Sequence, residues 1–393
     1  MNICGARPNF MKVAPLMQAC QRSGRIAPIL VHTGQHYDEN MSNLFFRELG
    51  MPQPDLNLEV GSGSHARQTA EVMTRFEPVL REHNPDWLVV VGDVNSTIAC
   101  ALVAVKLGVK VAHVEAGLRS FDRSMPEEIN RILTDAISDL LLVSEKSGVE
   151  NLRREGIPDA KVRFVGNVMI DTLIEHRQRA AASKILEELG LTPRRYVLVT
   201  LHRPSNVDDE LVFGGILDAL VEISKEICVA FVAHPRTRQR LESATTLCAK
   251  LSRAPNLHLI DPLGYLDFMK MMSDASVVLT DSGGIQEETT ILRVPCFTLR
   301  RNTERPVTVE QGTNKLVDPD TYSILRAWQS LRNRPRLTVS PPELWDGKAA
   351  ERIVECLFGE PNSAHEELEP SAATGAYSAG SLEAQAGLER DRY

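Results

Sequence analysis

The chain has 393 residues, of which 43% are hydrophobic and 24% charged, and its formal net charge is -8. This composition is typical of a globular protein, the length favours two domains, and the negative charge argues against a nucleic-acid or anionic-membrane partner. No apolar run approaches the roughly 18–20 residues of a membrane span. The N-terminus lacks a basic region followed by a long apolar core, so we expect no signal peptide and a cytoplasmic protein.

Seven cysteines are scattered singly along the chain. An odd set without a CxxC pair is typical of reduced thiols and argues against a disulfide or zinc framework. In HTGQHYDEN, His32 and His36 lie four residues apart without a nearby set of carboxylates, so we expect no metal. The turn after the first strand reads GARPNF instead of GxGxxG, which argues against a dinucleotide cofactor. We therefore expect no cofactor.

Short apolar or β-branched runs alternate with longer amphipathic stretches from one end of the chain to the other. Nearly continuous apolar runs of this length are typical of strands buried on both faces, and their alternation with helices predicts parallel sheets. The predicted strands lie in residues 1–4, 27–34, 87–93, 110–117, 140–144, 162–167, 196–202, 228–234, 257–261, 276–281 and 296–300.

This series is too long for one sheet and predicts two doubly wound, Rossmann-like α/β domains that face each other across a cleft. We expect an N-terminal domain over residues 1–168 and a C-terminal domain over 169–344, joined near 168–184. Residues 345–359 predict a last helix that packs back on the N-terminal domain. Residues 361–393 are rich in Ala, Ser, Gly and Glu without an apolar period, which predicts a disordered tail.

Polar residues or glycines follow six of the predicted strands, at residues 5–7, 92–93, 115–117, 202–203, 234–235 and 281–284. In a parallel α/β sheet, ligands bind at the carboxyl ends of the strands. Any one such residue is more often a helix cap than a ligand contact, but six together predict an active site.

TDSGGIQEE gives the sharpest single signal. Its strand ends before Ser282, and Gly283 and Gly284 allow a tight turn into a helix. The free amides and the positive end of the dipole at such a helix start favour a phosphate. Glu288 lies one turn further on, where its carboxylate could accept from two ribose hydroxyls. A tight βα turn without a ligand is the alternative.

Three further segments supply cations and histidines. In GARPNFMK, Arg7 and Lys12 are about one and a half helical turns apart and could reach one anionic ligand. Arg305 comes from TERP, and an arginine fork suits a diphosphate. His202 and His234 end two strands in the same half as Arg305. Solvated surface cations are the alternative, above all for Lys12.

The candidate acids, Asp93, Glu115 and Glu127, come from the N-terminal half. Acids among cations that grip a diphosphate would weaken the grip, so we expect one half to hold the leaving group and the other to transfer protons. Carboxylates packed close together have raised pKa values, so one could act as an acid and another as a base. Arg119 and Arg131 could keep selected acids ionised. A plain ion-pair network is the alternative.

The motifs GARPNFMKVAPL, VVGDVNST, HVEAGLRS, MPEEINR, TLHRPSN, LTDSGGIQEE and NTERPVTVEQGT occur in the order found in the non-hydrolysing UDP-N-acetylglucosamine 2-epimerases, and the chain resembles that family over roughly residues 1–360. The resemblance implies the two-domain glycosyltransferase-B fold, a homodimer, and interconversion of UDP-N-acetylglucosamine and UDP-N-acetylmannosamine without a metal or redox cofactor. It also implies elimination and re-addition of UDP through 2-acetamidoglucal, in the supply of precursors for cell-surface polysaccharides.

Matched motif by motif, the resemblance implies Asp93, Glu115 and Glu127 as the acid/base set and His202 as the group that stabilises the departing β-phosphate. The other residues expected at the substrate are Arg7, Lys12, Arg131, His234, Leu263, Phe268, Ser282, Gly283, Gly284, Glu288 and Arg305. Among these, Arg131 would support the acids, and Phe268 with the backbone of Leu263 would hold the uracil. Gln35, Arg67 and Arg203 are candidates for binding a second UDP-N-acetylglucosamine as an activator.

Two positions depart from the family pattern. Asn9 stands where an acidic residue is common, and Pro204 stands where a second arginine is common. These changes leave open a subgroup that acts on a modified UDP-2-acetamido sugar. Two further hypotheses are a hydrolysing epimerase or glycosyltransferase of the same fold, and a binding protein that has lost the chemistry.

Overall fold

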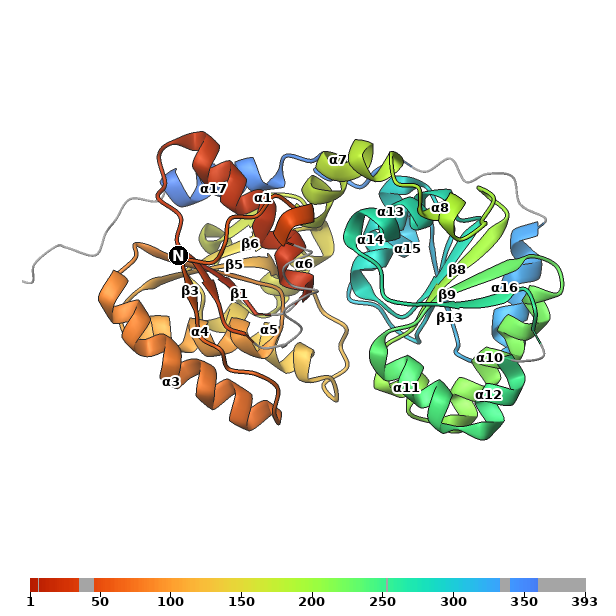
Figure 1. Cartoon of the computed structure of the whole chain (residues 1–393). Coiled ribbons are helices and arrows are strands. Elements are labelled where there is room, and N and C mark those ends of the chain that lie inside the picture. The colour runs from red at the N-terminus through yellow and green to blue at the C-terminus, as the bar shows by residue number, and fades with distance from the viewer. Residues whose placement is uncertain (6, 35–45, 252–253, 333–339, 360–393) are drawn as a thin grey trace, which may run out of the picture. The chain divides into compact units, whose positions relative to one another are not determined.

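A computed structural model describes residues 1–5, 7–34, 46–251, 254–332 and 340–359. These residues form two parallel β-sheets, each covered by helices (Figure 1). None of the helices in these ranges is long and apolar enough to cross a membrane.

The first sheet has seven strands in the order β3-β2-β1-β4-β5-β6-β7. Its strands are β1 (Asn2–Cys4), β2 (Leu30–His32), β3 (Leu56–Asn57), β4 (Trp87–Val91), β5 (Lys110–Ala116), β6 (Leu140–Val143) and β7 (Val162–Phe164). Its helices are α1 (Arg7–Ser23), α3 (His65–His83), α4 (Asn95–Lys106), α5 (Pro126–Ile137) and α6 (Lys146–Arg154).

The second sheet has six strands in the order β10-β9-β8-β11-β12-β13. Its strands are β8 (Tyr196–Thr200), β9 (Cys228–Val232), β10 (Leu257–Ile260), β11 (Val277–Thr280), β12 (Cys296–Leu299) and β13 (Asn314–Val317). Its helices are α9 (Pro204–Val207), α10 (Glu210–Ser224), α11 (Pro235–Ser243), α12 (Thr245–Leu251), α13 (Tyr265–Asp274), α14 (Gly283–Leu292), α15 (Val307–Glu310) and α16 (Thr321–Arg332).

Burial on both faces explains why the strand sequences are almost continuously apolar. In β4, Val89 and Val91 join a core that includes residues of α1, whereas Leu88 and Val90 join a separate core with residues of α3 and α4. Successive side chains of a strand point to opposite faces, so each sheet needs apolar residues at both parities. The predicted doubly wound α/β class is confirmed by both sheets.

Both sheets reverse their strand order at one point, between β1 and β4 in the first sheet and between β8 and β11 in the second. Ligands of doubly wound folds bind beyond the carboxyl ends of the strands at such a reversal. The segments that leave these four strands, and β5 beside them, carry most of the candidate site residues.

The apolar runs did not predict two strands, β3 and β13. Both are edge strands: β3 pairs over only two residues with β2, and β13 carries Asn314 and an exposed Lys315. Short and partly polar edges discourage pairing with another chain. They therefore lack the apolar signal of a central strand.

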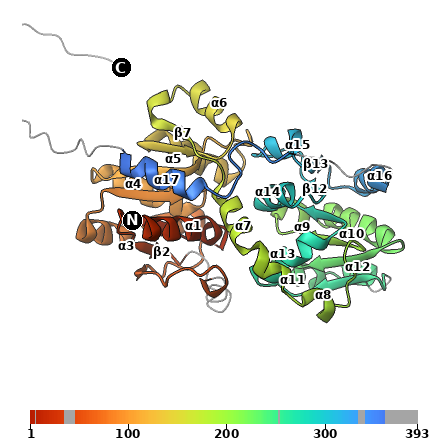
Figure 2. The ribbon, with the colours of Figure 1, turned by 90° about the horizontal axis from the view of Figure 1, so that it is seen from above.

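Helix α7 (Val168–Ala181) contacts α1 and α17 on one side and α13 and α14 on the other, and α8 (Ile185–Glu188) follows it. The last helix, α17 (Ala349–Gly359), lies alongside α1 (Figures 1 and 2), where Arg25 pairs with Glu355 and lies 4.4 Å from the centre of the Phe358 ring. It begins at Ala349, later than the predicted residue 345. The predicted tail, 361–393, lies outside the described residues.

Candidate active site

Asp93 follows β4 and is held by an arginine of α5. Gly92, with a φ of 67°, turns the chain at the end of the strand, and Arg131 pairs with both Asp93 and Glu128. Burial would raise the pKa of Asp93, but the guanidinium of Arg131 and the charge of Lys12 outweigh it and hold that pKa below its ordinary value. The prediction that packing raises the pKa of the acids is therefore wrong for Asp93, because a cation contacts it directly.

Glu115 lies at an irregular point of β5. Its φ is 69°, and the register with β6 shifts between Val114 and Ala116. The side chain is buried, with Oε2 paired to Lys12 Nζ and Oε1 at 3.8 Å from Arg305 Nη2. The backbone irregularity thus aims a buried carboxylate at cations from both halves of the chain, and such local strain is common at functional sites.

The two glutamates of MPEEINR have different surroundings. Glu128 is buried and accepts hydrogen bonds from Ser120 and from the Phe121 amide at 2.8 Å, so it fixes the loop before α5. Glu127 is half-buried in the first turn of α5. Its charge acts on Arg203, whose Nη1 lies 3.8 Å from Met125 Sδ at the start of the same helix.

Asp135 organises the rest of the HVEAGLR segment. Its carboxylate contacts His113 at 2.6 Å, the Gly117 amide at 3.0 Å and Arg119 at 2.7 Å. Arg119 also binds Glu155 at 2.6 Å, so the expectation that it keeps a candidate acid ionised is wrong. Sequence reasoning missed Asp135, although it lies on the face of α5 that also carries Arg131 and Glu128.

His202 is oriented by a buried aspartate at the end of β11. Asp281 Oδ1 lies 2.8 Å from His202 Nδ1, and the Asp281 carboxylate also accepts from the backbone amides of His202 and Arg203. Burial would raise the pKa of Asp281, but hydrogen bonding and charge from His202 hold it below its ordinary value. The ring of His234 lies 6.3 Å from that of His202, and its Nδ1 accepts from the Arg236 amide at the start of α11.

The glycine turn opens α14. The helix begins at Gly283, and the side chain of Ser282 does not cap it. A Cβ on Gly283 would lie 2.8 Å from Glu304 Oε1 and 3.0 Å from Arg305 Nη1, and one on Gly284 would lie 3.2 Å from Met169 Cε. A side chain at Gly283 would therefore displace the Glu304–Arg305 ion pair.

Arg305 is buried among three carboxylates. Its Nε lies 2.6 Å from Glu287 and its Nη1 2.9 Å from Glu304, with Glu115 at 3.8 Å. Buried charges require such close partners. The predicted separation of acids from cations is therefore wrong, because acids of both halves contact Arg305 and Glu115 also pairs with Lys12.

The proposed uracil and ribose residues lie around α13. Tyr265 donates its hydroxyl to Glu288 Oε1 at 2.8 Å, and burial raises the pKa of Glu288 to about 7. Leu263 and Phe268 are half-buried and pack against the same core as α13. Phe268 thus lies on α13, Leu263 lies just before it, and Glu288 of α14 contacts it through Tyr265.

The remaining candidates are less informative. Arg7 begins α1, Gln35 lies outside the described residues, and Arg67 is exposed in the first turn of α3. Within the ranges that the structure describes, no three His, Cys, Asp or Glu side chains are grouped to hold a metal ion.

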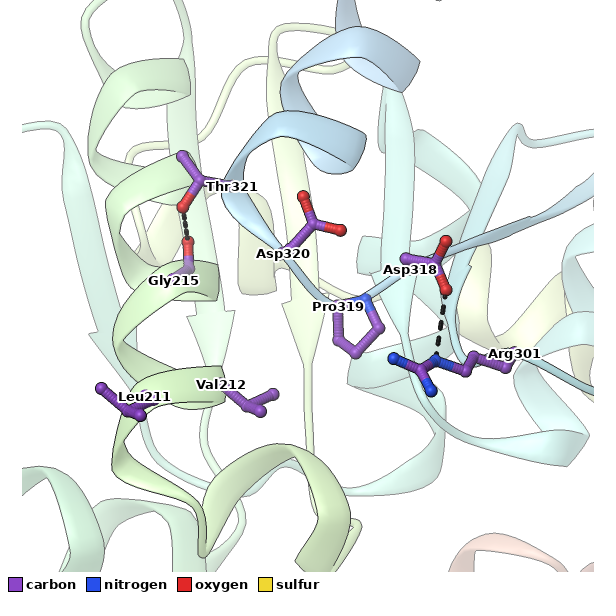
Figure 3. A pocket seen from close by; sticks show the side chains of 8 residues that line it. All are labelled: Leu211, Val212, Gly215, Arg301, Asp318, Pro319, Asp320 and Thr321. Carbon is purple, nitrogen blue, oxygen red and sulfur yellow. Dashed lines mark hydrogen bonds and ion pairs between the residues drawn. The ribbon is translucent and has the colours of Figure 1, made fainter.

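A surface hollow lies elsewhere, between α10 and the loop before α16 (Figure 3). Its polar side chains bind one another or the backbone: Arg301 pairs with Asp318 at 3.5 Å, and Thr321 donates to the Gly215 carbonyl at 2.8 Å. None of the candidate residues lines this hollow. We therefore do not expect the reaction to take place there.

Two doubly wound sheets, with paired carboxylates beyond one and a glycine turn beyond the other, define an α/β enzyme of the glycosyltransferase-B architecture. A family model described as UDP-N-acetylglucosamine 2-epimerase matches residues 18–358. The crystal structure of UDP-N-acetylglucosamine 2-epimerase from Methanocaldococcus jannaschii, in complex with UDP-N-acetylglucosamine and UDP, is similar with a TM-score of 0.85 and 42% identity, covering 91% of this chain and 99% of that one.

Two curated relatives agree. A UDP-N-acetylglucosamine 2-epimerase of Methanocaldococcus jannaschii is 43% identical, over 90% of this chain and 97% of the relative. A UDP-2,3-diacetamido-2,3-dideoxy-D-glucuronate 2-epimerase of Pseudomonas aeruginosa is 39% identical, over 91% of this chain and 98% of the relative. The chain belongs to the UDP-N-acetylglucosamine 2-epimerase family, a family of isomerases, as its motifs predict.

Proposed function

We propose that the protein interconverts UDP-N-acetylglucosamine and UDP-N-acetylmannosamine by eliminating and re-adding UDP. The C2 proton of the sugar has no carbonyl beside it, so deprotonation to a carbanion with UDP still attached is not feasible. In the elimination, a carboxylate removes that proton, the C2–H electrons form the C1=C2 bond of 2-acetamidoglucal, and UDP leaves with the C1–O electron pair. Addition of UDP at C1 with protonation of the opposite face of C2 completes the epimerisation.

One observation carries the proposal: Glu115 Oε1, near the end of β5, and Arg305 Nη2, beside the glycine turn, are 3.8 Å apart. Proton-transfer groups and a cation suited to a diphosphate therefore belong to one site. Asp93, with its lowered pKa, is ionised at neutral pH, as a base must be. Glu115 and Glu127 complete the acid/base set.

The remaining roles follow the chemistry of each group. Arg7, Lys12 and Arg305 would neutralise the diphosphate, the backbone at Ser282, Gly283 and Gly284 would hold a phosphate, and His202, oriented by Asp281, would donate to the departing β-phosphate. His234 lies beside His202, and Arg131 holds Asp93. Glu288 would hold the ribose, and Leu263 with Phe268 the uracil. A homodimer in the cytoplasm that supplies polysaccharide precursors remains our expectation.

A modified UDP-2-acetamido sugar is the second candidate substrate. The Pseudomonas aeruginosa relative, named for a diacetamido-glucuronate sugar, is almost as similar to this chain as the first relative, at 39% against 43% identity. Overall identity therefore does not separate the two substrates.

Incubation in deuterated water tests the proposal. With UDP-N-acetylglucosamine we expect deuterium at C2 of a nucleotide sugar that still carries UDP. Release of free UDP without labelled nucleotide sugar would favour a hydrolysing epimerase or a glycosyltransferase. The same assay with UDP-2,3-diacetamido-2,3-dideoxy-D-glucuronate compares the two substrates, and faster labelling identifies the preferred one.

A further inference from the structure

Tyr265 connects the proposed uracil and ribose contacts. It is the first residue of α13, the helix that carries Phe268, and its side chain is buried, with 4% of the residue exposed. Its hydroxyl donates to Glu288 Oε1 at 2.8 Å. The hydroxyl thus joins α13 to α14, two helices that the proposed function places at the same nucleoside.

The backbone and ring of Tyr265 are held by other elements. Its amide donates to Glu48 Oε2 at 2.6 Å, and the Glu48 carbonyl accepts from Arg179 Nη1 of α7 at 2.6 Å. The ring of His176, also on α7, meets the Tyr265 ring edge-on at 6.4 Å. Tyr265 is therefore a fixed donor, and its hydroxyl can set the position of a more adaptable partner.

Glu288 is such a partner. It is 3% exposed, and no cation pairs with it among the described residues. Glutamate has three rotatable side-chain bonds, and a carboxylate can accept about four hydrogen bonds. One bond from Tyr265 can therefore fix the carboxylate and still leave acceptor positions for two hydroxyl groups.

We propose that Tyr265 is a positioning residue for nucleotide recognition: its hydroxyl orients the Glu288 carboxylate toward the ribose hydroxyls of a uridine diphosphate. The inference rests on the proposed function, which gives Glu288 the ribose contact. If the Tyr265 hydroxyl acts only through Glu288, its removal should weaken the binding of ligands that have the ribose hydroxyls and leave the binding of other ligands unchanged.

Calorimetric titration of Tyr265→Phe with UDP and with 2′,3′-dideoxyuridine 5′-diphosphate tests this inference. Loss of one orienting hydrogen bond should weaken UDP binding by about fivefold, and binding of the dideoxy ligand should change by less than about twofold. For turnover of UDP-N-acetylglucosamine, we expect KM to rise while kcat stays within about twofold. The inference is overturned if Tyr265→Phe weakens the binding of both ligands equally, or if it weakens the binding of neither.

Tyr196→Phe is the matched control. Tyr196 is fully buried in the same half of the chain, and its hydroxyl donates to the Met271 carbonyl of α13 at 2.5 Å, so it holds the same helix as Tyr265 without contacting Glu288. Tyr196→Phe should leave the affinities for UDP and for the dideoxy ligand unchanged. If Tyr196→Phe also weakens binding of UDP, the effect of Tyr265→Phe reflects a general loss of packing in this half of the chain.

Glu288→Gln separates the inference from the proposed function. If this variant discriminates between the two ligands and Tyr265→Phe does not, the inference fails and the ribose contact stands. If neither variant discriminates, the ribose contact itself is wrong.

Discussion

The direct partners of Asp93 and Glu288 shift the pKa values of these two carboxylates in opposite directions. Asp93 contacts the guanidinium of Arg131, and its pKa is lowered. Glu288 accepts from the neutral hydroxyl of Tyr265, and burial raises its pKa to about 7. For Asp93 the nearby cations outweigh the desolvation, whereas for Glu288 one neutral hydrogen bond does not. Half-buried Asp93 and buried Glu288 can therefore differ in protonation at neutral pH.

Asp93→Asn should reduce turnover by at least about a thousandfold, because an amide cannot take the C2 proton. The affinity for UDP should stay within about tenfold, or 1.4 kcal/mol, since Asp93 is not expected to contact the nucleotide. Activity assays and calorimetry with UDP measure the two effects. Asp159→Asn, which removes a carboxylate from an exposed pair with Arg153, is the control. An equal loss of UDP binding would make Asp93 a structural residue.

At the scale of elements, α5 holds the end of β5 in place. Asp135 of α5 binds His113, the Gly117 amide and Arg119, which surround Glu115 in the sequence. The motif HVEAGLR thus contains Glu115, a proposed acid/base residue, and several residues that anchor the strand to the helix.

Asp135→Asn should destabilise the fold by about 3 kcal/mol, because it removes one partner from a buried ion pair. Burial would raise the pKa of Asp135, but His113 and Arg119 hold it below its ordinary value of 3.8. A lowered pKa in the folded state adds stability above the unfolded pKa, and this is lost as the pH falls through and below about 4.

Urea unfolding at pH 7 and at acid pH measures this effect. The difference between wild type and Asp135→Asn should be largest at pH 7 and should shrink toward pH 3. Asp139→Asn serves as the control, because exposed Asp139 accepts only from the Val111 amide at 2.9 Å. A difference that does not change with pH would contradict the role given to the charge of Asp135.

The start of α17 depends on a side chain from α7. Asp171 accepts from the amides of Ala349 and Ala350 at 3.1 Å and 2.7 Å, and so caps the first turn of α17. Asp171→Ala should cost about 1 kcal/mol and should speed amide exchange in residues 349–359 more than elsewhere. Asp261→Ala, which removes an exposed partner of Arg238, is the control. Uniform acceleration across the chain would mean that the cap has no local role.

For the whole molecule, the sequence predicted the strands that are buried on both faces. It missed β3 and β13 because short edge strands carry few apolar residues. It also predicted which strand ends carry polar groups, since parallel strands deliver their carboxyl ends to one edge of a sheet.

The partners of those polar groups could not be predicted. Glu304 and Glu287 meet Arg305, and Asp281 meets His202, through the relative placement of helices and loops. No pattern along the chain encodes that placement. One local signal for these partners was present: TDSGGIQEE and TERP contain more acids than one ribose contact requires, which suggests that the other acids pair with cations.

The most direct test of the account is whether UDP leaves the sugar during turnover. UDP-N-acetylglucosamine would carry oxygen-18 in the bridge between C1 and the β-phosphorus. If the C1–O bond breaks, the freed β-phosphate can rotate before UDP adds back. The account predicts that epimerised product carries part of the label in non-bridging β-phosphate positions. Complete epimerisation with all the label still in the bridge would contradict it.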